Sequence, residues 1–152
     1  MIGAWPVSPG TYVLILQALA PTEVNVGRLG RFTLPAGRYA YVGSAQGPGG
    51  LSARLARHAR PDKSMHWHID YVTAVLPLVH VCAVAGGERL AGSERVECVW
   101  TRRLLALPTA QAPVAGFGNG DCRAGCPAHL IRLPDDLSLA RLLARLEEIL
   151  LA

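Results

Sequence analysis

The segment YAYVGSAQGPGGLSARLARH, residues 39–58, restricts the fold of this chain more than any other feature. Tyrosines stand at alternate positions at its start, which is typical of a strand whose every second side chain faces the same side. The glycine-rich turn GPGG then leads into a short basic helix, ARLARHAR, with Ser52 as its N-cap. A strand, a tight turn and a helix in immediate succession predict a sheet with a helix packed against it.

Other periodic segments complete a small α+β domain. Strands are expected over 11–18, 38–43 and 78–85, with an inserted hairpin over 22–37. Helices are expected over 64–76, 96–107 and 135–152, although the first half of 64–76 also fits a strand. This order predicts a small, mainly antiparallel three-stranded sheet flanked by helices. The last helix carries a stripe that suits core packing or a dimer surface, so the oligomeric state stays open: Leu139, Leu142, Leu143, Leu146 and Ile149.

Length and composition limit the class of protein. The 152 residues suit one domain, 1–152, and 17% charged residues argue against a disordered chain. The net charge of +4 permits an anionic partner without requiring one. No uninterrupted apolar run of membrane-spanning length and no signal peptide is recognisable, so we expect cytoplasmic residence, no membrane partner and reduced cysteines.

Five polar side chains are expected to meet near the end of the strand 38–43. Tyr39 and Tyr41 share one face of that strand, and pairing with strand 11–18 would bring Tyr12 beside them. Arg54 and His58 share one face of the following helix, because they are four residues apart. Each residue alone is usually structural, but their occurrence together in this order favours a functional site.

Two further motifs contain possible metal ligands, and both are left open. In HWHID, His66, His68 and Asp70 would form a triad on a strand, whereas a hydrogen-bonded pair is the alternative on a helix. In CRAGCPAH, Cys122, Cys126 and His129 offer three zinc ligands. Cys98 or Asp121 would have to supply the fourth ligand.

Basic side chains on two helices suggest a surface that follows a nucleic-acid backbone; ordinary surface charge is the alternative. These residues are Arg57, Arg60, Lys63, Arg102 and Arg103. Neither a major-groove recognition helix nor a stacked aromatic platform is evident, so we expect little sequence specificity.

The order of these motifs resembles the GIY-YIG nuclease superfamily. GTY (10–12) and YVG (41–43) stand for the two tripeptides, followed by Arg54, His58 and a glutamate that opens a later helix, Glu97. The strings YVGSA, RHARP, HWHIDY, EC and GFGNGDC resemble one uncharacterised branch of that superfamily, which extends the similarity over a core of about 10–133. Members of that branch also occur joined to base-excision repair glycosylases.

The resemblance implies a metal-dependent endonuclease that hydrolyses DNA phosphodiester bonds, with repair or the cutting of particular DNA structures as its expected role. Glu97 would hold one Mg²⁺ or Mn²⁺, and Arg54 would brace the phosphate oxygens. Tyr12 would take the proton of the attacking water, oriented by Tyr41 and His58. Gly43 and Ser44 would lie near the phosphate, although Ser44 replaces a lysine of some members, and Asn119 is the candidate for the family's final asparagine.

Two other functions are compatible with the same residues. One is a nucleic-acid-binding module that keeps the fold but has no turnover, and the other is a zinc-stabilised interaction domain. The choice between DNA and RNA, the nucleic-acid structure that is cut and the existence of a glycosylase partner are not decided by the sequence.

Overall fold

The computed structural model describes residues 4–89, 94–118, 122 and 124–151. Its elements follow in the order β1 (Gly10–Ala18), β2 (Thr22–Asn25), the 3₁₀ turn η1 (Gly27–Leu29), β3 (Arg31–Leu34), β4 (Gly37–Ala45), α1 (Gly50–Ala59), α2 (His68–Thr73), β5 (Leu78–Ala85), α3 (Val96–Leu105), β6 (Leu130–Arg132) and α4 (Leu139–Leu151). The α+β class is therefore confirmed.

The main sheet has four antiparallel strands in the order β5-β1-β4-β6, so the expected three-stranded sheet is wrong by one strand. The added strand is the short apolar segment after the glycine-rich loop, where Ile131 pairs with Ala40. Three residues are too few to show an alternating pattern in the sequence. The expected hairpin forms a separate sheet of β2 and β3.

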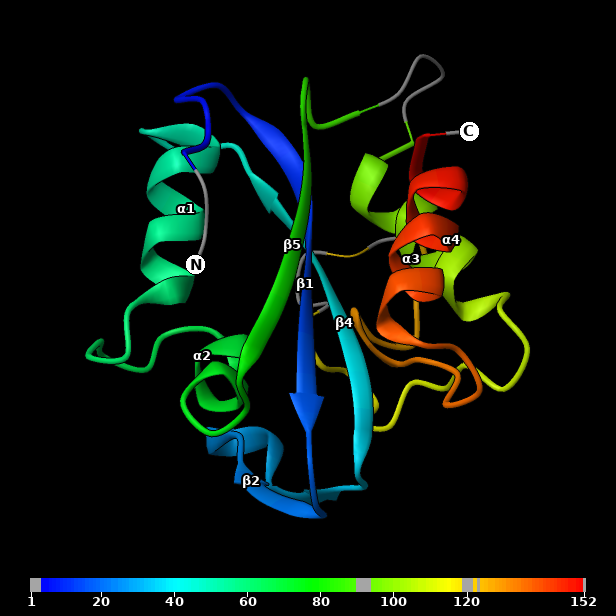
Figure 1. Ribbon diagram of the computed structural model, residues 1–152. Coiled ribbons are helices and arrows are strands. Elements are labelled where there is room, and N and C mark those ends of the chain that lie inside the picture. The colour runs from blue at the N-terminus through cyan, green and yellow to red at the C-terminus, as the bar shows by residue number, and fades with distance from the viewer. Residues whose placement is uncertain (1–3, 90–93, 119–121, 123, 152) are drawn as a thin grey trace.

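Helices cover both faces of the main sheet (Figure 1), with α1 and α2 on one side and α3 and α4 on the other. Strand β1 is buried on both faces, because its successive side chains point alternately into the two cores on either side of the sheet. Leu14 belongs to the core beneath α1 and α2, whereas Val13 and Ile15 pack with Trp100 and Leu142 of α3 and α4. The apolar run at 11–18 is explained by this three-layer arrangement.

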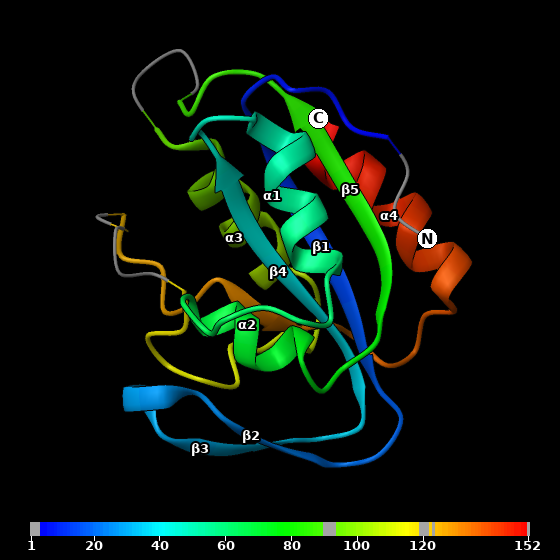
Figure 2. The ribbon, with the colours of Figure 1, turned by 90° about the vertical axis from the view of Figure 1, so that its left-hand side faces the viewer.

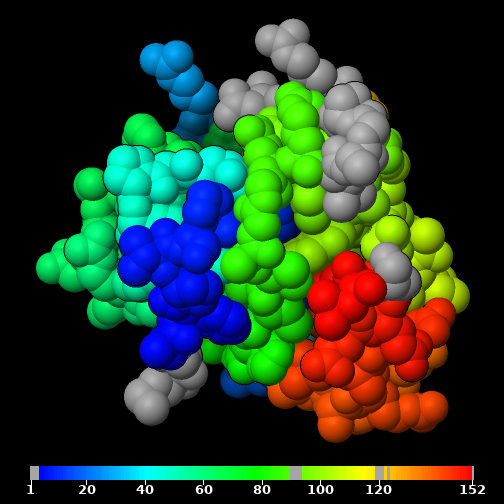
Figure 3. All heavy atoms as spheres, turned by 90° about the horizontal axis from the view of Figure 1, so that it is seen from above, coloured from blue at the N-terminus to red at the C-terminus, as the bar shows by residue number. Residues whose placement is uncertain are grey.

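The start of α1 is set by the N-terminal segment rather than by Ser52, which lies inside the helix. Gly49 is the N-cap in the left-handed conformation, with φ of 83°. The first amides are satisfied by backbone carbonyls: Leu51 N–H donates to Ser8, and Ser52 N–H donates to Pro6. Figure 3 shows this N-terminal segment in blue, packed beside β5.

The other helix boundaries differ from the expected ones in a similar way. Helix α2 begins after Trp67 and not at Ser64, because the Asp70 carboxylate in the first turn accepts the backbone N–H of the N-cap residue Trp67. Helix α4 begins at Leu139, where the Ser138 hydroxyl accepts the Arg141 N–H. Its stripe packs in the core, since Leu142 and Leu146 are fully buried. Among the helices of the described residues, none has the length and apolarity needed to cross a bilayer.

Candidate active site and metal cluster

A cavity of about 400 Å³ opens at the edge of β4. Strand β6 pairs with β4 only from Tyr39 to Tyr41, so no strand covers the last residues of β4 on this side in the described part of the chain. Helix α1 approaches that edge from one face of the sheet and α3 from the other, as Figure 2 shows. The five expected catalytic and metal-binding residues all line this cavity: Tyr12, Tyr41, Arg54, His58 and Glu97.

Tyr12 and His58 form a buried hydrogen-bonded pair, with 2.7 Å between the Tyr12 Oη and the His58 Nε2. Burial, reinforced by the nearby cations Lys63 and Arg54, lowers the pKa of His58 to about 3, so the imidazole is neutral. Burial also raises the pKa of Tyr12, an effect that outweighs the lowering by Arg54. Arg54 therefore does not make Tyr12 a phenolate. The pair instead suits a phenol that donates to Nε2 of His58.

Gly43 is needed because the Tyr12 ring crosses it. Tyr12 and Gly43 are direct partners in the β1–β4 ladder, and a Cβ at position 43 would lie 2.4 Å from the Tyr12 Oη. No side chain fits in that space. Gly118 has a comparable role on the other side of the cavity, where a Cβ would lie 2.9 Å from Cε1 of Tyr41. Both glycines thus leave room for the tyrosine rings.

Trp67 lies between two arginines. The Arg54 guanidinium lies 4.4 Å from the Trp67 ring centroid and the Arg57 guanidinium 4.2 Å from it. Arg54 also donates a hydrogen bond to the backbone carbonyl of Ser44. This bond directs the Arg54 guanidinium towards the cavity, so the contribution of Ser44 is made by its backbone. The indole and the Ser44 carbonyl therefore fix Arg54 before any ligand binds.

Asp70 anchors Arg57 and does not act with His66 and His68 as a metal triad. Its buried carboxylate accepts two hydrogen bonds from Arg57, at 2.6 and 2.9 Å, and two more from the backbone N–H groups of His66 and Trp67. These contacts lower the pKa of Asp70 to about 2 although burial alone would raise it. Nδ1 of His68 accepts the Gly118 N–H. The hydrogen-bonded alternative for HWHID is the one that the geometry supports.

Glu97 stands in the first turn of α3, as the sequence predicts, and is only 8% exposed. Its Oε1 lies 2.7 Å from Nη2 of Arg95, which also contacts Glu88 at 2.9 Å. Arg95 was not found from the sequence, because no motif connects it to the other residues. The carboxylate is therefore oriented by an arginine at the cavity wall.

Three basic residues that were expected to contact phosphate are instead bound to other groups of the protein. Both terminal nitrogens of Arg57 bind Asp70, and Lys63 donates to the carbonyls of Arg57 and His58 at the end of α1. Arg103 donates to the Ile149 carbonyl of α4. For these three residues the expected phosphate grip is replaced by helix-end and ion-pair contacts.

Two of the expected basic residues stay at the surface. Arg60 is exposed after the end of α1, and Arg102 is exposed with Glu94 2.6 Å from its Nη2. The expected asparagine, Asn119, and the alternative zinc ligand Asp121 lie outside the described residues.

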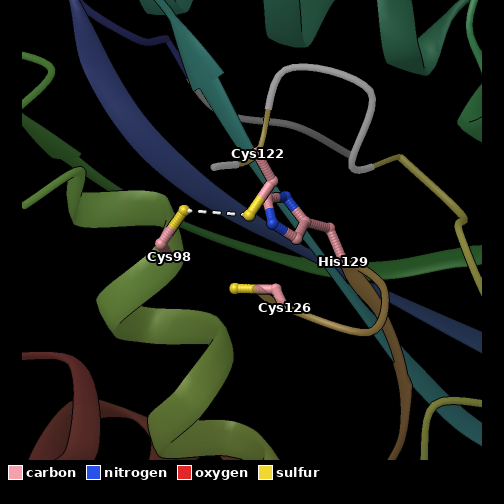
Figure 4. Close-up of side chains that lie close together, drawn as sticks. All are labelled: Cys98, Cys122, Cys126 and His129. Carbon is pink, nitrogen blue, oxygen red and sulfur yellow. Dashed lines mark hydrogen bonds between the residues drawn. The ribbon is translucent and has the colours of Figure 1, made fainter. Parts of the chain in front are cut away.

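Four possible metal ligands meet beside the cavity, and we call them the Cys3His cluster: Cys98, Cys122, Cys126 and His129. Their ligand atoms all lie within 4.8 Å of one another, so the cluster could hold a metal ion. Cys98, from the first turn of α3, is the fourth ligand that the sequence left undecided. Figure 4 shows its sulfur facing Cys122, with Cys126 and with His129, the residue just before β6, close by.

Comparison with known proteins gives one match. A family model described as "Domain of unknown function DUF123" matches residues 11–151, a range that contains all the cavity residues named above and the Cys3His cluster. Neither a curated protein nor a solved structure matches the chain.

Proposed function

The chain belongs to the DUF123 family, and we propose from the geometry of its polar cavity that it is a metal-dependent endonuclease of the GIY-YIG type acting on DNA. The observation that carries this proposal is the meeting of five residues from four elements in one cavity. Tyr12 comes from β1, Tyr41 from β4, Arg54 and His58 from α1, and Glu97 from α3. Packing alone does not require two phenols, a guanidinium, an imidazole and a carboxylate at one sheet edge.

The reaction would use the Tyr12–His58 pair as a proton relay. As a water oxygen forms its bond to phosphorus, its proton passes to the Tyr12 hydroxyl, whose own proton passes to Nε2 of His58. The bond from phosphorus to the 3′ oxygen then breaks, and the 3′ oxygen takes a proton from a solvent water in the cavity to leave as a hydroxyl. Arg54, fixed on Trp67, would bind the non-bridging oxygens on which negative charge develops. The negative phosphodiester also favours the imidazolium that the relay produces.

Glu97 suits a single hard cation. It offers carboxylate oxygens at the wall of a cavity large enough for waters and a phosphate group, and Mg²⁺ or Mn²⁺ accepts such a set. When bound, the ion would supply Lewis-acid stabilisation of the phosphate and of the leaving oxygen. Arg95 would keep the carboxylate turned to the cavity.

The residues that would contact the nucleic acid outside the cavity indicate little sequence specificity. Arg60 and Arg102 are exposed and suited to phosphate contacts, but no described helix is exposed as a base-reading element. We therefore propose that the protein acts in the cytoplasm, in repair, on DNA recognised by shape or damage, together with a glycosylase partner. The ion pair of Glu97 with Arg95 favours one second candidate, a nucleic-acid-binding module without turnover.

A cleavage assay on labelled single-stranded, duplex, flapped and abasic DNA tests the proposal. Mg²⁺, Mn²⁺ and EDTA are compared for the wild type, Glu97→Gln and Arg54→Ala. Tyr39→Phe is the matched control for Tyr12→Phe, because the Tyr39 hydroxyl donates to the Pro35 carbonyl away from the cavity. We expect metal-dependent cutting that Glu97→Gln abolishes and Tyr39→Phe retains. DNA binding without cutting in either metal would support the second candidate, and equal cutting by Glu97→Gln would refute the proposed site.

A further inference from the structure

We propose that the Cys3His cluster binds one Zn²⁺ ion that holds the wall of the cavity in place. The geometry is already close to that of a tetrahedral site. The sulfur atoms of Cys98 and Cys122 are 3.6 Å apart. Two thiolates at ~2.3 Å from a tetrahedral ion would be separated by ~3.8 Å. No large movement of the chain is needed to admit the ion.

His129 gives an independent indication of a ligand. The residue is 2% exposed, and neither ring nitrogen has a hydrogen-bond partner among the described residues. A buried imidazole without partners is costly, and a metal ion removes the cost at one nitrogen. Because Nδ1 lies 3.8 Å from Oε2 of Glu97, Nε2 is the nitrogen assigned to the metal. The Nδ1–H would then point to the Glu97 carboxylate, the usual arrangement of a histidine ligand.

The ligand set selects the metal and its role. Three thiolates and an imidazole suit a soft or borderline ion with tetrahedral geometry, which is Zn²⁺ and not Mg²⁺. Four protein ligands leave no position for a reacting water, so the site is structural. A disulfide is the competing chemistry. However, none of the four cysteines, all of which are described, is in a disulfide, and 3.6 Å is far beyond the ~2.05 Å of an S–S bond.

The ligand positions show what the ion would stabilise. Cys98 follows Glu97 directly in α3, Cys122 and Cys126 lie in the loop after α3, and His129 precedes β6. Cys122 and His129 also line the cavity. One ion would therefore tie the first turn of α3 to the loop and to the edge strand, across segments that are far apart in the sequence. Its effect on Glu97 rests on the proposed nuclease function, but the binding itself does not.

Metal analysis of the full chain, purified without chelator, tests the proposal directly. We expect one equivalent of zinc per chain. Replacement by Co²⁺ should give the intense visible bands of a tetrahedral thiolate site together with thiolate charge-transfer absorption. In the native zinc protein a thiol reagent should modify at most one cysteine, Cys82, and all four after unfolding in chelator. The Co²⁺ spectrum is recorded on the wild type, so it does not depend on the folding of a variant.

Cys122→Ser and Cys82→Ser form a matched pair, because Cys82 lies on β5 and outside the cluster. We expect Cys122→Ser to lose zinc and the Co²⁺ charge-transfer bands, and Cys82→Ser to keep both. Absence of stoichiometric metal together with no Co²⁺ bands, or a Cys98–Cys122 disulfide found by mass spectrometry, would overturn the proposal. Zinc without DNA cleavage would leave this proposal standing and refute only the nuclease.

Discussion

Replacing the buried carboxylate of Asp70 tests how much its ion pair with Arg57 and its hydrogen bonds stabilise the fold. We predict that Asp70→Asn lowers the free energy of unfolding while keeping the shape of the side chain. The native carboxylate has no exposed surface and accepts hydrogen bonds from Arg57 and from the backbone of His66 and Trp67. An asparagine amide would place N–H groups against some of these donors, so the variant loses a charge and gains unfavourable contacts.

The size of the effect follows from the pKa of Asp70. A fall from 3.8 to about 2 corresponds to about 2.5 kcal/mol of stability at neutral pH. Because the folded pKa is below the unfolded one, this contribution is complete above about pH 5 and is lost as the pH falls through 3.8 towards 2. At pH 3 about half of it should remain. Breaking a fully buried ion pair costs roughly 3–5 kcal/mol, and Arg57 retains some exposure, so the expected loss at pH 7 is about 2.5–3 kcal/mol.

Urea unfolding of the wild type and Asp70→Asn at pH 7, 5, 4 and 3 measures this difference. Asp62→Asn is the control, since Asp62 is an exposed acid in the turn before α2. Any metal released by acid is lost from all three proteins, so the comparison isolates Asp70. A difference below about 0.5 kcal/mol at pH 7, or one that stays constant down to pH 3, would show that the carboxylate is not stabilised as the contacts imply.

Three further predictions concern the cavity. Gly43→Ala should displace the Tyr12 ring, cost about 1–3 kcal/mol of stability and abolish cleavage, whereas Gly87→Ala, which has open space around it, should leave both unchanged in unfolding and cleavage assays. Tyr12→Phe should cost only about 1 kcal/mol, from the hydrogen bond to His58, yet eliminate cleavage; retained cleavage would exclude the relay. Because the pKa of His58 is lowered to about 3, the unfolded state takes up its proton first, so wild-type stability should fall by about 1.4 kcal/mol per pH unit below 6.5 relative to His58→Gln. Parallel pH profiles of the two proteins would contradict a neutral buried imidazole.

The sequence was informative wherever local periodicity decides the structure. Strand 78–85 was predicted with its observed bounds, and the apolar run at 11–18 lies within β1, because alternation and turn residues act within a few positions. Prediction from the sequence failed where a segment far away in the chain determines the local structure. Ser52 has the side chain of an N-cap, but the carbonyls of Pro6 and Ser8 satisfy the first amides of α1 instead.

The same distinction applies to the site. Residue type and order predicted that Tyr12, Tyr41, Arg54 and His58 would lie together, the resemblance added Glu97, and all five line one cavity. Charge alone could not distinguish Arg57, held by Asp70, from Arg54, which faces the cavity, because both stand in the same helix. Arg95 was missed because its role depends on a folded partner.

The incomplete edge of β4 explains how the two faces of the sheet supply one site. A continuous β6 would separate α1 from α3, since pairing over the full strand would cover the positions beside Gly43 and Ser44. The β6 strand ends opposite Tyr41, one further backbone bond joins the Val42 N–H to the His129 carbonyl, and the chain before β6 carries His129 and the cysteine loop to that edge. The backbone bonds from Gly116 to Pro127 and from His129 to Phe117 join parts of this loop to each other and do not attach it to the sheet. An opening that exposes the polar groups of the cavity also removes the ladder that would hold its wall, and the proposed metal ion at the first turn of α3 would restore that support without closing the cavity.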